Sequence, residues 1–220
     1  MAKNKHKDLT LTPPNVITLI EETAQKGLPK LTLTQLGLTK LPPEIGQLTQ
    51  LKHLYLYQNN LTHLPPEIGQ LVSLTQLAVN NNRLQKLPAE IGQLANLERL
   101  YLFKNELTRL PAEIGQLRKL NYLTLLNNRL TMLPPEIGQL QQLTKLHLGG
   151  NQLTQLPVEI AQLSNLTELW LSGNRLTTLP DEISNLTQLT YLDISGNHIH
   201  RLPHHIRELP GLKIDGWEDD

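Results

Sequence analysis

The segment Leu51-Lys52-His53-Leu54-Tyr55-Leu56-Tyr57-Gln58-Asn59-Asn60-Leu61 decides the fold, because its pattern returns at a fixed interval along the chain. Its frame is L-x-x-L-x-L-x-x-N-x-L, in which isoleucine or valine occasionally replaces leucine. The asparagine of this frame recurs every 23 residues, at Asn59, Asn82, Asn105, Asn128, Asn151, Asn174 and Asn197. A fixed period of this length indicates a solenoid, in which each repeat packs only against its neighbours.

Each repeat combines a short strand, a turn and a return limb. In Leu54-Tyr55-Leu56 the leucines point inward and the tyrosine outward, as in a strand, and we expect successive strands to pair in parallel. The asparagine at each turn can bond backbone groups that would otherwise be buried without partners. The limb Leu64–Leu71, L-P-P-E-I-G-Q-L, begins as a short helix or 3₁₀ turn does. Its glycine becomes Ala161 and Ser184 in later copies, which indicates close packing rather than a required positive φ.

These features resemble the typical 23-residue leucine-rich repeat. The return limb is similar to that of Ras-suppressor-like and Scribble-like proteins and of bacterial relatives, including the repeat segment of Roco proteins, and the similarity spans Leu28 to about Leu209. The resemblance implies an α/β leucine-rich-repeat solenoid, a right-handed arc with a parallel sheet on its concave face and short helices or 3₁₀ turns on its convex face. It also implies recognition of a macromolecule, most often a protein, without fixing the partner.

The segments that flank the repeats are expected to cap them. We predict an N-terminal arm and capping helix over residues 1–27, eight repeats over 28–211, and a C-terminal cap with an acidic tail over 212–220. The helix is expected over Asn15–Gly27, with Gly27 as its stop. One face of this helix carries the apolar residues Val16, Leu19, Ile20 and Ala24.

The last strand cannot follow the strict repeat, because a 23-residue spacing would put Asp215 at a core position. We therefore expect the register of the stretch Leu209–Ile214 to slip by three residues. Trp217 would then cover the open end of the core, and the acidic tail Glu218–Asp220 would keep that end soluble.

Composition narrows the classes of partner. Lysine plus arginine equals aspartate plus glutamate, at 20 each, so no global field recruits a nucleic acid or an anionic membrane. No apolar run approaches the roughly 18 residues of a membrane span, and there is no cysteine for a disulfide or a thiolate site. We expect a monomeric, cytoplasmic protein without a cofactor, and the starting Met1 with caps at both ends favours a complete polypeptide.

Function is expected at the strand positions that the repeat frame leaves free. Seven of the eight aromatic residues occupy three such positions, and the exception is Trp217. Aromatic residues and arginine anchor protein interfaces, so we predict a protein-binding surface on the concave face. Cross-strand stacking, worth ~0.2–1 kcal/mol a pair, is the alternative reason for the rings. The expected binding residues are Tyr55, Tyr57, Arg99, Tyr101, Phe103, Lys104, Tyr122, Leu126, Lys145, His147, Trp170, Tyr191 and Asp193.

The order of these residues predicts zones. The amino-terminal half is apolar with Arg99 and Lys104 beside it, Lys145 and His147 continue a basic stripe, and Glu168 and Asp193 supply acid. A partner with an apolar ridge and an acidic shoulder would match this order. A sensor segment of a larger, Roco-like signalling assembly and a surface for a small ligand or saccharide remain as alternatives.

No catalytic motif is present, and we expect no enzyme. The glutamates that recur at 44, 67, 90, 113, 136, 159 and 182 occupy one helix-start position each. The histidines His198, His200, His204 and His205 form the one unusual cluster. Because His204 and His205 are adjacent, we expect their side chains to point apart, which favours a solvated, partly titrating cap over a metal site.

Overall fold

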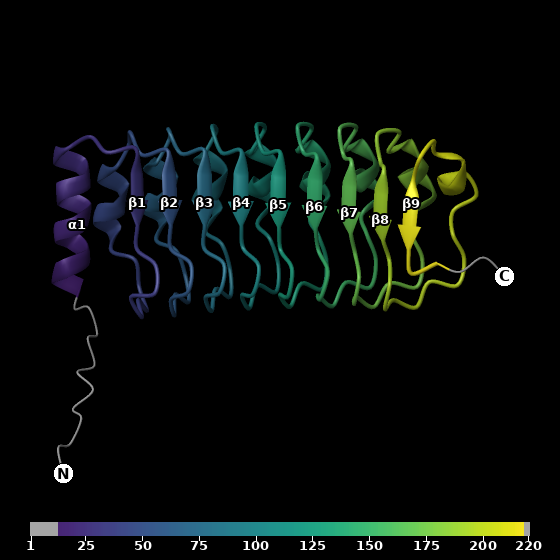
Figure 1. Cartoon of the computed structure of the whole chain (residues 1–220), viewed down its shortest axis with the longest axis horizontal. Coiled ribbons are helices and arrows are strands. Elements are labelled where there is room, and N and C mark those ends of the chain that lie inside the picture. The colour runs from purple at the N-terminus through teal and green to yellow at the C-terminus, as the bar shows by residue number, and fades with distance from the viewer. Residues whose placement is uncertain (1–12, 218–220) are drawn as a thin grey trace, which may run out of the picture.

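Nine parallel strands form one open sheet in a computed structural model that describes residues 13–217. The strands lie side by side in chain order, from the purple to the yellow end in Figure 1. Every repeat therefore contributes its strand to the same face, as the sequence predicted. The strands are β1 (Lys30–Thr32), β2 (His53–Tyr55), β3 (Gln76–Ala78), β4 (Arg99–Tyr101), β5 (Tyr122–Thr124), β6 (Lys145–His147), β7 (Glu168–Trp170), β8 (Tyr191–Asp193) and β9 (Lys213–Asp215).

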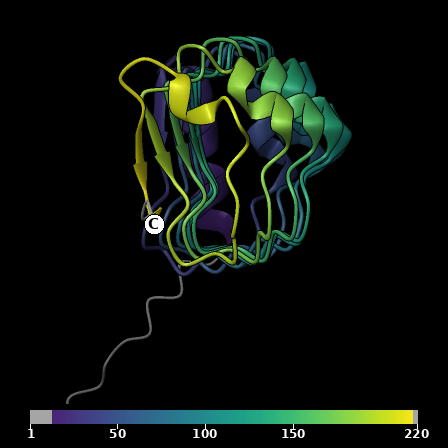
Figure 2. The ribbon, with the colours of Figure 1, turned by 90° about the vertical axis from the view of Figure 1, so that its right-hand side faces the viewer.

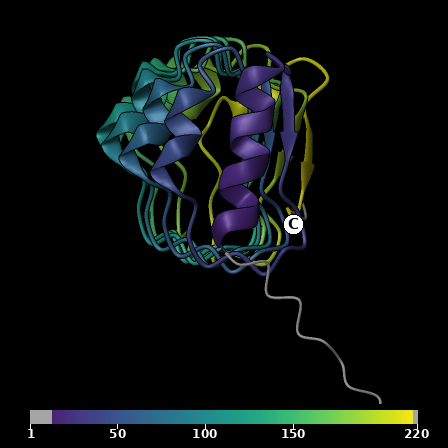
Figure 3. The same ribbon diagram turned by 90° about the vertical axis from the view of Figure 1, so that its left-hand side faces the viewer.

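Short 3₁₀ helices form the opposite layer of the solenoid. In the end-on view of Figure 2 they stack on the far side from the sheet, and those of the middle repeats, in teal, project furthest. Figure 3 shows the same offset from the other end, so the stack is bowed with the sheet on its concave side. The helices are η1 (Pro43–Gln47), η2 (Pro66–Gln70), η3 (Ala89–Gln93), η4 (Ala112–Gln116), η5 (Pro135–Gln139), η6 (Val158–Gln162), η7 (Asp181–Asn185) and η8 (Ile206–Glu208).

The core is a continuous aliphatic column between these two layers. The register pairs Leu54 with Leu77 and Leu77 with Leu100, and all three side chains are fully buried. One isoleucine of each 3₁₀ helix, such as Ile91 of η3, closes the column from the other side. Because burial of each such side chain is worth about 1.5–3 kcal/mol, the repeated column is the main source of stability.

The frame asparagines form a buried hydrogen-bond ladder, as predicted. The Asn82 Oδ1 atom accepts a hydrogen bond from the N–H of Leu61 in the preceding repeat at 3.0 Å. Its Nδ2 atom donates to the carbonyls of Leu56 and Val79, at 2.9 and 3.0 Å, so one side chain ties two repeats together. Each asparagine thus serves backbone groups at a turn that no strand or helix satisfies.

Two glycine columns have different causes. On the return limb, a Cβ atom added to Gly92 would lie 2.7 Å from the carbonyl oxygen of Glu113, which confirms close packing between 3₁₀ helices. Directly before the frame asparagine, Gly150, Gly173 and Gly196 have positive φ angles of 67°, 63° and 64°. Turn geometry is therefore the reason for these glycines, since glycine adopts a positive φ without strain.

The amino-terminal cap is the helix α1 (Pro13–Gln25), which lies beside β1 at the end of the stack (Figures 1 and 3). Gly27 follows it with a φ of 57°, which confirms the predicted stop. The predicted apolar face was wrong in part, because the buried residues are Val16, Ile20 and Thr23, whereas Leu19 and Ala24 are exposed. The Thr23 hydroxyl donates to the Leu19 carbonyl at 2.7 Å, which lets this polar residue face the core.

The carboxy-terminal strand β9 slips by one residue instead of the expected three. Ile214 pairs with Leu192, and Asp215 then lies opposite Asp193 on the outward row. A slip of one residue is enough to replace the aspartate by an aliphatic side chain at the core position. Leu212 instead closes a turn, where its N–H donates to the Leu209 carbonyl at 3.3 Å. Trp217 packs partly buried against the end of the core, as predicted.

The predicted arm over residues 1–12 and the acidic tail Glu218–Asp220 lie outside the described residues. None of the helices that the structure describes has the length and apolar character needed to cross a membrane.

Candidate functional site

The strand register arranges the outward side chains in rows that run along the concave face. Tyr55 pairs with Ala78 and Ala78 with Tyr101, so these residues occupy neighbouring strands at the same height. The full middle row is Tyr55, Ala78, Tyr101, Thr124, His147, Trp170 and Asp193. The tyrosine, phenylalanine and tryptophan rings on this row and on the rows to either side of it are half-buried, and the His147 ring is buried. None of these rings belongs to the aliphatic core column.

A hollow of about 240 Å³ opens on this face over β2, β3 and β4. Its walls are Tyr55 and Tyr57 on one side and Tyr101 on the other, and its floor is Ala78. The hollow exists because alanine, whose side chain is a single methyl group, stands between two strands that carry large rings. Gln76 and Asn80 line its ends and supply polar groups.

A second group of rings runs continuously from β4 to β8. The ring centroids of Tyr101 and Tyr122 lie 5.2 Å apart, and those of Tyr122 and His147 also lie 5.2 Å apart. The chain continues from His147 to Trp170 at 4.8 Å and from Trp170 to Tyr191 at 5.5 Å. These separations are those of favourable aromatic pairs, so part of each ring surface is already used in stacking between repeats.

The predicted basic stripe at β6 is neutralised by its neighbours. The Lys145 Nζ atom lies 2.6 Å from a carboxylate oxygen of Glu168, and the His147 Nε2 atom lies 3.6 Å from the other oxygen. Burial lowers the pKa of His147 below its ordinary value, although the Glu168 carboxylate opposes this shift. Burial raises the pKa of Glu168, but the hydrogen bonds and charges of Lys145 and His147 together lower it below its ordinary value. The zone is therefore a lysine–glutamate pair beside a neutral imidazole.

The carboxylate of Asp193, which the sequence analysis placed in the acidic zone of the face, is likewise engaged in hydrogen bonds. Asp193 is buried, and its carboxylate accepts hydrogen bonds from the backbone N–H and the hydroxyl of Ser195 at 3.1 and 2.6 Å. The Tyr191 hydroxyl donates to the Asp215 carboxylate at 2.6 Å, and this hydrogen bond raises the pKa of Tyr191 to about 12. Lys213 pairs with the same carboxylate at 2.9 Å. The polar groups at the carboxy-terminal edge of the sheet are therefore paired with one another.

Four further predicted residues, Arg99, Phe103, Lys104 and Leu126, lie on or next to β4 and β5. Arg99 and Lys104 are exposed at the two ends of the outward stretch that contains Tyr101. Phe103 and Leu126 are half-buried on the row that follows the strands. The predicted binding residues do not include those at the floor and ends of the hollow, which are Gln76, Ala78 and Asn80. They also do not include Lys30, whose Nζ atom lies 5.1 Å from the centre of the Tyr55 ring. The signal for the floor was a small residue between two tyrosine-bearing repeats.

Of the four histidines near the carboxy-terminal end, His204 and His205 lie together, and His198 and His200 lie outside their group. His204 and His205 do not point apart as expected, because their ring centroids lie only 4.6 Å apart. Among the described residues, one group could hold a metal ion, and it joins these two histidines to Glu208 without His198 or His200.

Family models now identify the repeat. A model for a leucine-rich repeat region matches residues 42–121, and a second model for the leucine-rich repeat matches residues 141–199. The chain is a leucine-rich-repeat protein. Its resemblance to the Ras-suppressor-like and Scribble-like branch stays a prediction. A comparison with curated proteins found no match.

Solved structures share the leucine-rich-repeat architecture. A leucine-rich-repeat protein of Leptospira interrogans is 40% identical with a TM-score of 0.77, covering 88% of this chain and 56% of that one. The repeat domain of the type III effector XopL is 27% identical with a TM-score of 0.72, covering 90% and 79%. A plant peptide hormone receptor, solved with its peptide, is 30% identical with a TM-score of 0.66, covering 80% and 33%. The chain thus spans little more than half of the Leptospira protein.

Proposed function

We propose that the concave face binds a protein partner, and that one apolar side chain of the partner enters the hollow over Ala78. The observation that carries this proposal is the hollow itself, walled by Tyr55, Tyr57 and Tyr101 on adjacent strands. Tyrosines around a pocket that a partner side chain fills are typical of the residues that dominate binding energy at interfaces.

The size of the hollow favours a side chain over a free small molecule. Its volume of about 240 Å³ lies below the roughly 300–1,000 Å³ of typical small-molecule sites. An extended protein segment can use such a hollow as one anchor point while its backbone runs along the rows on either side. The saccharide alternative therefore has less support than a protein partner.

The distribution of charges on the face also favours the end of the sheet that carries the hollow as the binding site. From β6 to β9 the charged groups Lys145, Glu168, Lys213 and Asp215 are paired with each other. Beside the hollow, Arg99 and Lys104 are exposed, and neither forms an ion pair within the described part of the chain. A partner that carries acidic residues next to its apolar anchor would complement these two cations.

The plant peptide hormone receptor supports a polypeptide as the class of partner by analogy, since that structure was solved as a complex with its hormone. We extend this to the present chain as a proposal, with a different and unidentified partner.

The test is affinity capture with the immobilised protein and three variants. Tyr101→Ala removes a wall of the hollow, Ala78→Trp fills it, and Val158→Ala, an exposed position on η6 of the convex layer, is the matched control. Wild type and Val158→Ala are expected to capture the same partner. Tyr101→Ala should weaken its binding by at least about 2 kcal/mol, or roughly 30-fold.

The variants also separate binding from stacking. If the rings serve only to stabilise neighbouring repeats, Tyr101→Ala lowers the unfolding free energy by ~0.2–1 kcal/mol and leaves capture unchanged. Unchanged capture by both Tyr101→Ala and Ala78→Trp would overturn the proposal.

A further inference from the structure

The last turn before β9 displays three polar side chains on an anchored backbone. Leu202, Pro203 and Ile206 are buried, whereas His204, His205 and Glu208 are exposed. Buried residues on both sides of the histidines hold this segment against the end of the core. The exposed groups are therefore presented from a fixed backbone, at the opposite end of the solenoid from α1 (Figure 1).

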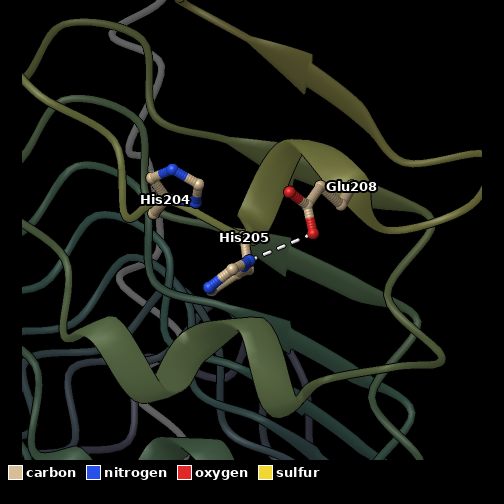
Figure 4. A group of neighbouring side chains, drawn as sticks. All are labelled: His204, His205 and Glu208. Atoms are coloured by element: carbon tan, nitrogen blue, oxygen red, sulfur yellow. Dashed lines mark hydrogen bonds and ion pairs between the residues drawn. The ribbon is translucent and has the colours of Figure 1, made fainter.

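The 3₁₀ geometry of η8 brings two of these groups together. With three residues per turn, positions i and i+3 lie directly above one another, which places Glu208 over His205. The His205 Nδ1 atom lies 3.0 Å from the Glu208 Oε2 atom (Figure 4). The ring of His204 lies 4.6 Å from that of His205, and one ligand atom from each of the three residues falls within 4.8 Å of the others.

We propose that His204, His205 and Glu208 form a binding site for a divalent transition-metal ion, of which zinc is the best fit. Two imidazoles and one carboxylate are a donor set that zinc uses, whereas magnesium and calcium prefer oxygen ligands alone. Around a tetrahedral zinc ion with bonds of about 2.1 Å, ligand atoms are separated by roughly 3.4 Å. His205 and Glu208 are already at that range, and His204 reaches it by a small rotation of an exposed side chain.

Charged residues of both signs lie near the proposed metal site. Arg201 and Asp181 line a hollow of about 390 Å³ together with His204 and His205, so one cation and one anion face the site. Arg207, on the same turn, lies over the Trp217 ring at 5.3 Å from its centre. Because the charges of Arg201 and Asp181 offset each other, the carboxylate of Glu208 gives the site its negative charge. Three protein ligands leave a fourth coordination position for water or for a side chain of another molecule.

The experiment is isothermal titration calorimetry of zinc chloride into the full chain without a histidine tag, near neutral pH. The variants are His205→Ala, Glu208→Gln, and a matched control with His198→Ala and His200→Ala, both exposed histidines outside the group. Thermal unfolding in the presence of a chelator checks that every variant is folded.

We expect wild type and the double control to bind one zinc ion per chain with the same affinity. His205→Ala and Glu208→Gln should each weaken binding by at least about tenfold, which is the least that loss of even an outer-shell partner costs. The proposal is overturned if wild type shows no saturation below about 1 mM zinc. It is also overturned if the double control loses as much affinity as His205→Ala.

Discussion

Replacing Asn128 with alanine tests how the buried ladder stabilises the solenoid. The Asn128 Oδ1 atom accepts a hydrogen bond from the Leu107 N–H at 3.0 Å, and its Nδ2 atom donates to the carbonyls of Leu102 and Leu125, both at 3.0 Å. These carbonyls keep a second donor after the substitution, because Asn105 also bonds Leu102 and Asn151 also bonds Leu125. The Leu107 N–H has no such substitute.

The magnitude follows from this asymmetry. One orphaned buried N–H costs about 1–3 kcal/mol, and each of the two lost hydrogen bonds to carbonyls costs about 0.5–1.5 kcal/mol. We therefore expect Asn128→Ala to lower the unfolding free energy by about 4 kcal/mol. Asn197→Ala is the matched control, because Asn197 makes the equivalent hydrogen bonds from a half-buried position near the end of the stack. Water can replace its bonds, so the cost there should stay below about 2 kcal/mol.

Urea unfolding measures both variants, with the midpoint reporting stability and the slope reporting whether the array still unfolds as one unit. A cost for Asn128→Ala no larger than that for Asn197→Ala would refute the argument that the buried ladder depends on this single N–H contact.

Three further predictions concern backbone strain and titration. Gly173→Ala should lower the unfolding free energy of the protein by about 1–2 kcal/mol, since an L side chain is strained at a φ of 63°. Lys104→Gly, at the equivalent position with a φ of 53°, should raise the unfolding free energy by about 0.5–1 kcal/mol. Changes of the same sign for both variants in urea unfolding would contradict this reasoning. Burial lowers the pKa of His147 in the folded protein below its unfolded pKa of 6.5. The contribution of the neutral ring to stability is therefore complete above pH 6.5 and is lost as the pH falls towards the folded pKa. His147→Gln should lose less stability than wild type between about pH 7 and about pH 5. The raised pKa of Tyr191, about 12, means that its contribution is complete below the ordinary value of 10 and is lost as the pH rises through 12. In an absorbance titration Tyr191→Phe should remove the ionisation step near pH 12. A trace identical to wild type would count against the Asp215 hydrogen bond.

The strands, the asparagine ladder and the outward rows could be predicted because a single periodic frame determines them. Once Leu54 and Leu56 must face the core, Tyr55 has to face outward, and the 23-residue period repeats this choice in every strand. The resemblance to leucine-rich-repeat proteins rested on the residues of the same frame, and the family models agree with it. These features depend on which residue types recur, and the sequence displays that directly.

The ends and the electrostatics could not be predicted, because they depend on single contacts. The helix α1 buries Thr23 instead of Ala24, since its hydroxyl finds a carbonyl within its own helix. Residues that are distant in sequence and close in space, such as Tyr191 and Asp215, carry no periodic signal. The hollow over Ala78 likewise depends on which side chain is small between larger neighbours, and this becomes visible only when the strands are aligned.

Photocrosslinking from the hollow tests the central claim most directly. A photoreactive phenylalanine analogue at Gln76, which lines the hollow, is compared with the same analogue at Val158 on the convex layer. The account predicts a covalent adduct with the partner from position 76, abolished by Ala78→Trp, and none from position 158. An adduct from position 158 alone, or one from position 76 that survives Ala78→Trp, would contradict it.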